Sequence, residues 1–270
     1  MKTIRLILLF FTIALTGCED VVDVDLGTSE PKLVIDALIK WEKGTPGNDQ
    51  VIKLSMTAPY FSEEIPPVSG AQVTVTGPTA TFVFAEETPG VYACHDFVPQ
   101  IGAEYTLQVV YAGNTYSAVE KLYPVPQISG IEQSASGGFT GEDIEVKAFF
   151  TDDGSTDDQY LFRFKASYYA IPFYEVVEDR FFQGNEIFAL YSDDEMEAGD
   201  AIEISVLGIS RRYYNYMNIL TGIAGSNGGS PFQTPPATVR GNIVNVTNED
   251  DFPLGFFALA ESSTSAYTVQ

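Results

Sequence analysis

Residues 105–119 have the sequence YTLQVVYAGNTYSAV, and this stretch decides the fold class. Two strand-like runs lie on either side of Ala112-Gly113, a pair that suits the tight turn of a β-hairpin. Turn-forming residues 102–104 precede Tyr105, so we expect the Tyr105 hydroxyl to hydrogen-bond backbone across a corner of a β-sandwich. The stretch therefore predicts antiparallel β structure, with Tyr105 in a structural role.

Five more strand-like runs precede this hairpin, and turn signals separate them at regular intervals. The seven runs cover residues 33–39, 51–56, 73–76, 81–84, 91–94, 105–111 and 114–119. Seven short strands of this kind indicate an immunoglobulin-like β-sandwich, which we place at residues 31–124. The predicted boundary is Pro124-Val125-Pro126, because proline favours extended backbone and cannot donate a hydrogen bond within a sheet.

The second half, residues 125–270, is predicted to be another β-rich domain that carries one short α-helix. Residues 168–191 are aromatic and apolar without a clear period, so irregular strands and long loops are expected there. Regular strands are expected at residues 144–150, 160–166, 202–207, 239–246 and 254–260.

The helix is expected at residues 210–220, because apolar and aromatic side chains recur there at helical spacing. Tyr213 and Tyr216 lie on this apolar face. Ser210 can cap the start of the helix, and Gly222 can end it.

The N-terminus has the pattern of a bacterial lipoprotein signal. Residues 1–17 combine a positive start with an apolar run that is too short for a bilayer, which needs about 20 residues. The signal ends in Leu15-Thr16-Gly17-Cys18, where small residues let the processing enzymes reach the Cys18 thiol. We expect Cys18 to be lipidated and to begin the mature chain, followed by an acidic tether over residues 18–30.

Composition limits the classes of function. The formal net charge of the 270-residue chain is −23 at pH 7, so nucleic acid is excluded as a partner. Because Cys18 carries the lipid, Cys94 has no disulfide partner and is expected to be a small buried apolar residue. His95 is the only histidine, and neither G-x-S-x-G nor H-E-x-x-H occurs. We therefore expect no enzymatic activity.

The acidic loop DDGSTDD at residues 152–158 is the candidate metal site. Asp152, Asp153, Asp157 and Asp158 place carboxylate oxygens around a glycine turn, which suits Ca²⁺ because this ion takes roughly six to eight oxygen ligands. The loop lacks the regular spacing and the distal glutamate of an EF-hand. The alternative is a solvated turn between two strands, with no cofactor.

The predicted helix also gives a candidate surface for a ligand or partner. Tyr213 and Tyr216 share one face of it, and the Gly-rich segment that follows ends in Ser230-Pro231-Phe232. Aromatic side chains beside such a loop can contact a ligand or a receptor. The alternative is that the two tyrosines only cover the sheet.

Several phrases follow one another in the order of a known family. They lie at residues 31–35, 66–75, 90–92, 102–107, 150–153, 213–216, 230–232, 242–245 and 254–258. With the lipoprotein box, they resemble a family of Bacteroidota-type surface lipoproteins known as a domain of unknown function, the 4249 family. The resemblance covers nearly the whole mature chain, but Ser230 stands where the family has asparagine, which weakens a specific role for this position.

The resemblance implies a location and a role. Such lipoproteins are often encoded beside TonB-dependent outer-membrane receptors. The expected function is therefore that of an accessory or ligand-capture partner, lipid-anchored in the outer membrane and facing the cell surface. Two alternatives stay open: a surface adhesin or structural lipoprotein, and a carboxylate-dependent glycan hydrolase, which needs two carboxyl groups about 5–9.5 Å apart in a cleft.

Overall fold

A computed structural model describes residues 30–270, except for residues 60–61, 63, 139–140, 181 and 225–238. The chain divides into two units, Met1–Glu30 and Pro31–Gln270, of which the second contains every described residue except Glu30. The predicted signal peptide and Cys18 lie outside the described residues, as does the predicted tether except for Glu30.

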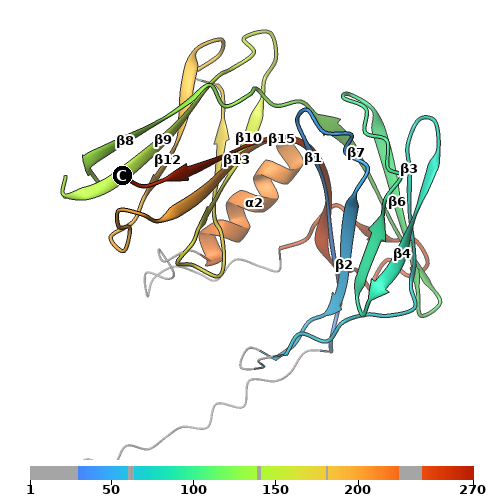
Figure 1. Cartoon of the computed structure of the whole chain (residues 1–270). Helices are drawn as coiled ribbons and strands as arrows, with labels where there is room; N and C mark the ends of the chain where they lie inside the picture. The colour runs from blue at the N-terminus through green and yellow to red at the C-terminus, as the bar shows by residue number, and fades with distance from the viewer. Residues whose placement is uncertain (1–29, 60–61, 63, 139–140, 181, 225–238) are drawn as a thin grey trace, which may run out of the picture. The chain divides into compact units, whose positions relative to one another are not determined.

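Seven strands occupy the first half of the second unit, where seven were predicted (Figure 1). They are β1 (Leu33–Glu42), β2 (Gln50–Met56), β3 (Gln72–Thr76), β4 (Thr81–Thr88), β5 (Val91–Cys94), β6 (Glu104–Tyr111) and β7 (Asn114–Tyr123). They pair in the order β1-β2-β5-β4-β3-β6-β7. The last strand, β15 (Leu254–Thr268), pairs in parallel with both β1 and β7, so the strands close into a ring around an apolar core.

The second half is also built mainly of strands. These are β8 (Gly130–Gly137), β9 (Asp143–Thr151), β10 (Gln159–Ala166), β11 (Phe173–Glu178), β12 (Glu186–Ser192), β13 (Ala201–Ile209) and β14 (Val244–Asn245). A three-stranded sheet of β12, β9 and β8 faces β10 and β13 across a second apolar core, which contains Phe150, Phe162 and Phe164. The prediction of a mainly β chain is confirmed.

Three expectations about the strands of the second half were wrong in detail. Residues 168–191 contain two regular strands, β11 and β12, where irregular structure was expected. The strand expected at 239–246 is reduced to the two residues of β14. The strand expected at 254–260 continues to Thr268, because its later residues pair with β13.

Strand β15 is shared by the two halves of the unit. Its first part pairs with β1, where Asp36 lies opposite Phe256, and its second part pairs with β13. Phe257 faces the core inside the ring, whereas Phe256 and Ala258 belong to a third apolar cluster under the helix. Eight consecutive residues of β15 are buried, as expected for a strand that is covered on both faces.

The hairpin that sets the fold class forms as predicted. Tyr111 pairs with Asn114 across the turn, and Ala112 and Gly113 both have positive φ, the geometry of a type I′ hairpin turn. The Tyr105 hydroxyl donates to the Val98 carbonyl at 3.0 Å and accepts from the backbone N–H of Gln100 at 2.9 Å. The structural role predicted for Tyr105 is thereby confirmed.

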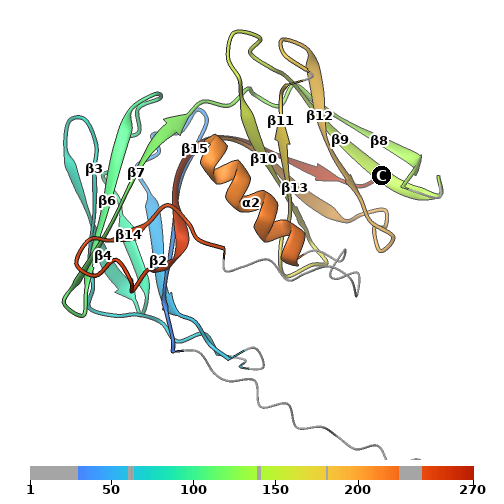
Figure 2. The same cartoon turned by 180° about the vertical axis from the view of Figure 1, so that it is seen from behind.

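The helix α2 (Arg211–Ala224) lies where the sequence predicts it and packs against β10 and β11 (Figure 2). The predicted cap is confirmed, because the Ser210 hydroxyl accepts a hydrogen bond from the Tyr213 N–H at 3.1 Å. The predicted end at Gly222 was wrong, since the helix continues for two more residues. Gly222 has no positive φ, so it does not form the left-handed cap that ends many helices.

The boundary expected at residues 124–125 stays a prediction. One apolar core draws its residues from before this point and from residues 243–259, and another draws only on residues after it. Among the described residues, no helix has the length and apolar character needed to cross a membrane.

Candidate functional site

A cleft of about 650 Å³ lies between α2 and the face of β10, β13, β15, β1 and β2 that is turned away from the two large cores. We call it the α2 cleft. It is lined by Val34, Asp36, Leu38, Lys40, Val51, Lys53, Leu161, Arg163, Tyr174, Glu203, Leu207, Tyr213, Tyr216, Met217, Leu220, Gly255 and Phe256.

The alternation of β1 places a carboxylate in this cleft. Ile35 and Ala37 point into the core of the ring, so Asp36 between them points to the opposite face. On that face Asp36 has Lys53 of β2 as one cross-strand neighbour and Phe256 of β15 as the other. A single acidic residue in the apolar run LVIDALI thus becomes a charged group in the wall of the cleft.

Three aromatic rings form the adjoining wall. Tyr213 and Tyr216 are stacked, with their ring centroids 6.1 Å apart and an interplanar angle of 15°. Each of these rings also lies 4.9 Å from the ring of Phe256. The helical spacing of the two tyrosines and the pairing of β15 with β1 therefore bring aromatic side chains beside Asp36.

Three polar groups in this wall have no partner among the residues that the structure describes. Within the described part of the chain, the carboxylate of Asp36 and the hydroxyls of Tyr213 and Tyr216 make neither a hydrogen bond nor an ion pair. Asp36 is exposed, Tyr216 is half-buried, and Tyr213 is only 8% exposed. They are available to a ligand, as expected of polar groups that converge in a binding site.

The electrostatics of the wall follow from its partial enclosure. Although Asp36 is exposed on one side, the side chains around it remove part of its hydration and thereby raise its pKa, and the positive charge of Lys53 offsets part of this rise. Burial also raises the pKa of Tyr213 and of Tyr216, and the negative charge of Asp36 adds to both shifts.

Most other charges in the cleft are paired. Arg163 Nη1 lies 2.5 Å from a carboxylate oxygen of Glu203. Lys40 Nζ lies 3.7 Å from a carboxylate oxygen of Glu42. Lys53 is exposed and makes no ion pair among the described residues, so it can turn toward solvent.

Of the five residues predicted to contact a ligand or partner, two line the α2 cleft and three are not described by the structure. Tyr213 and Tyr216 both line the α2 cleft, and they also cover the sheet, since both pack against Phe256. Ser230, Pro231 and Phe232 lie outside the described residues. Sequence reasoning missed Asp36, although an isolated acidic residue within a predicted apolar strand was a usable signal.

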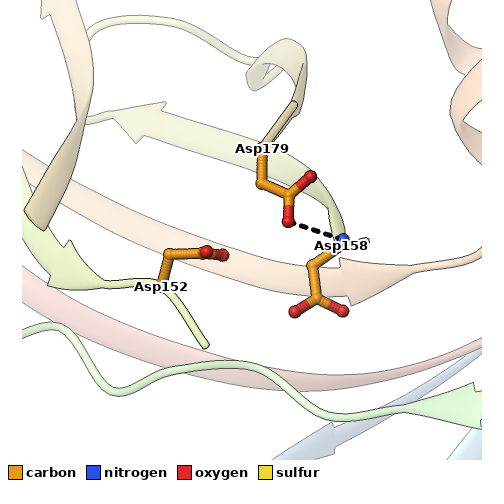
Figure 3. Close-up of side chains that lie close together, drawn as sticks. All are labelled: Asp152, Asp158 and Asp179. Carbon is orange, nitrogen blue, oxygen red and sulfur yellow. Dashed lines mark hydrogen bonds between the residues drawn. The ribbon is translucent and has the colours of Figure 1, made fainter. Parts of the chain in front are cut away.

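The predicted metal loop contributes two of its four aspartates to a cluster. Oxygen atoms of Asp152, Asp158 and Asp179 lie within 4.8 Å of one another (Figure 3). Asp153 and Asp157 do not join them. Asp153 accepts hydrogen bonds from the backbone N–H and the hydroxyl of Ser155, and Asp157 accepts one from the Gln183 side chain.

Hydrogen bonds hold the three clustered carboxylates in place. Asp152 accepts from the Tyr160 hydroxyl at 2.5 Å and from the Gly184 N–H at 3.0 Å. Asp179 accepts from the backbone N–H of Asp158 at 2.9 Å, the contact that is drawn in Figure 3. Sequence reasoning missed Asp179, because it follows β11 and reaches the loop only through the pairing of β11 with β10.

This cluster borders a second cleft, of about 750 Å³. Asp152 and Asp158 lie in one wall, and Lys121 and Tyr123 of β7 lie in another. Burial raises the pKa of Asp158, and the negative charges of its neighbours Asp152 and Asp179 add to the rise. A small cation that prefers oxygen ligands would relieve this repulsion, and a calcium site at these residues stays a prediction.

Cys94 and His95 do not contribute to either cleft. The Cys94 side chain is buried, as predicted, and burial raises the pKa of its thiol to about 11. His95 lies at the surface. Its Nδ1 is 2.7 Å from a carboxylate oxygen of Asp49, and its Nε2 is 2.9 Å from a carboxylate oxygen of Glu87.

Comparisons with known proteins show the family of the chain. A two-domain fibronectin type-III segment from chicken tenascin is 14% identical over 67% of this chain and 91% of its own, with a TM-score of 0.23. A DUF4785 family protein from Legionella pneumophila is 9% identical over 65% of this chain and 52% of its own, with a TM-score of 0.27. At such scores neither structure supports an argument. No curated protein matches the chain. Residues 19–266 match the family described as Domain of unknown function (DUF4249), and the chain belongs to this family.

Proposed function

We propose that the chain is a non-enzymatic lipoprotein of the outer-membrane surface, held there by a lipid on Cys18. In this proposal it captures a ligand for a TonB-dependent transporter. The α2 cleft is the capture site. The lipoprotein box at residues 15–18 supports the anchor, and the lack of a recognisable catalytic motif supports a binding role.

One observation carries the capture role. Asp36, Tyr213 and Tyr216 line one cleft beside aromatic and aliphatic side chains, and their polar groups have no partner in the described part of the chain. Ligand sites typically combine an apolar lining with a small number of polar groups of this kind, which fix the orientation of the ligand. The strands β1 and β15 and the helix α2 hold these groups on rigid elements, so the site is formed before a ligand arrives.

We also propose the finer domain assignment, an immunoglobulin-like sandwich followed by a second β domain. The seven strands of the first half and the tyrosine corner at Tyr105 support it. In this arrangement β15 returns from the second domain to complete the first.

Co-purification from the native host tests the transporter role. The full-length chain with a C-terminal tag would be extracted from membranes in mild detergent, and the proteins bound to it would be quantified by mass spectrometry. Cys18→Ser is the matched control, because it removes the proposed anchor and leaves the described fold unchanged. We expect a TonB-dependent receptor with the anchored chain and much less with the control. Equal, background amounts of receptor in both samples would refute the proposal.

A carboxylate-dependent glycan hydrolase is the second candidate. The observation that favours it is the carboxylate pair of Asp152 and Asp158, which lies in a cleft with oxygen atoms within 4.8 Å. A retaining hydrolase needs two carboxyl groups at about 5 Å. Release of reducing ends from a panel of glycans, abolished by Asp158→Asn, would establish this activity in place of the binding role.

A further inference from the structure

We propose that the α2 cleft binds a protonated amine on an apolar stem, with Asp36 as its counter-ion and the hydroxyls of Tyr213 and Tyr216 as further acceptors. This inference rests on the proposed capture function and names the chemical class of the ligand.

The polar groups of the cleft suit an ammonium group. An ammonium carries three hydrogen-bond donors and no acceptor, and an ionised carboxylate accepts only. The Asp36 carboxylate and the hydroxyls of Tyr213 and Tyr216 are acceptors in the lining of the cleft that make no hydrogen bond to any described residue. A primary ammonium has three donors to offer to oxygens of this kind, whereas a neutral hydroxyl has a single donor.

The surroundings of these oxygens also favour a cation. The faces of aromatic rings are negative, and Phe256 and the two tyrosines put three rings next to Asp36. Partial burial raises the free energy of the Asp36 carboxylate, and a bound cation would lower it. The net charge of −23 attracts cations to the protein from a distance.

Lys53 is the one charge in the cleft that opposes this binding. Arg163 and Lys40 are paired with Glu203 and Glu42, so they add little positive potential. Lys53 is the cross-strand neighbour of Asp36, and it is exposed on a long, flexible side chain. Removal of its charge should therefore strengthen the binding of an amine, a change in the opposite direction from removal of Asp36.

The stem of the ligand would lie along aliphatic side chains. Leu38, Leu161 and Leu207 line the same cleft. Leu220 is 38% exposed and Val51 is 44% exposed, so both present apolar surface that a ligand can cover. A cleft of about 650 Å³ admits a molecule larger than an ammonium ion alone.

Calorimetric titration of the full-length chain in detergent tests this inference. The probes are phenethylamine and Nα-acetyl-lysine amide, each with a neutral match, 2-phenylethanol and Nα-acetyl-norleucine amide. We expect saturable binding of at least one amine and at least about tenfold weaker binding of its neutral match, the scale of a charged hydrogen bond. Asp36→Asn should weaken amine binding by about tenfold or more. Lys53→Gln should strengthen it severalfold, as a nearby like charge is removed.

The outcomes separate the ligand class from the capture function. If neither amine binds, if the neutral matches bind equally well, or if Asp36→Asn and Lys53→Gln leave the affinity unchanged, the amine inference is wrong. If the receptor co-purifies although no amine binds, only the ligand class is wrong. If the amines bind as expected but no receptor co-purifies, the ligand class stands and the transporter role is wrong.

Discussion

Replacement of Asn242 by alanine should destabilise the fold strongly, because this side chain completes the pairing of β15. Its amide nitrogen donates to the Phe257 carbonyl at 2.8 Å, and its amide oxygen accepts from the Phe257 N–H at 2.9 Å. Both partners are backbone groups of a fully buried residue. Asn242 thus acts in place of a neighbouring strand at this point.

The size of the effect follows from these two bonds. A buried backbone group left without a partner costs about 1–3 kcal/mol, so two such groups give a loss of about 2–6 kcal/mol. Each kcal/mol lowers the Tm of a domain of this size by about 2–4 °C. We therefore expect Asn242→Ala to lower the Tm by about 4 °C at the least.

Thermal and urea unfolding followed by circular dichroism would measure this change. Asn218→Ala on α2 is the matched control, because the Asn218 side chain is exposed and makes no hydrogen bond among the described residues. The control should stay within about 0.5 kcal/mol of the wild type. An Asn242→Ala protein as stable as the Asn218→Ala control would refute the role assigned to Asn242.

Three further predictions concern other parts of the fold. Tyr105→Phe removes two hydrogen bonds to backbone and should lower the free energy of unfolding by about 1–3 kcal/mol in urea titrations. An unchanged urea midpoint would contradict the structural role of the Tyr105 hydroxyl. Hydrogen bonds to Glu87 and Asp49 raise the pKa of His95, so the NMR titration of this histidine should have its midpoint above the usual 6.5. The small contribution of these bonds to stability should be present at lower pH and should be lost as the pH rises through the raised pKa. A titration at or below 6.5 would contradict these bonds. Excess Ca²⁺ should raise the Tm of the wild type more than that of Asp179→Asn. Equal increases in the Tm of the two proteins would refute the prediction of a metal site at this cluster.

The local elements could be predicted from the sequence because their causes are local. The hairpin follows from Ala112-Gly113 and the strand-like runs beside it, and the start of α2 follows from Ser210 three residues before Tyr213. The tyrosine corner joins residues at most seven positions apart. In each of these cases the residues that determine the structure lie within one short window.

The rest depends on contacts between residues far apart in the chain. Strand β15 returns to pair with β1 more than 200 residues earlier, and no local pattern specifies that partner. β11 forms where periodicity was unclear, because β10 supplies its hydrogen bonds. For the same reason no local pattern indicated that Asp36 would line the same cleft as Tyr213, or that Asp179 would join Asp158.

The location of the ligand site is tested most directly by NMR. Backbone amide shifts of the isotope-labelled chain would be followed during titration with the amine that binds more tightly. The account predicts that the largest shifts occur at Asp36, Lys53 and Tyr216, around the α2 cleft. Shifts confined to the acidic loop at residues 152–158, or shifts of the same size throughout the chain, would contradict it.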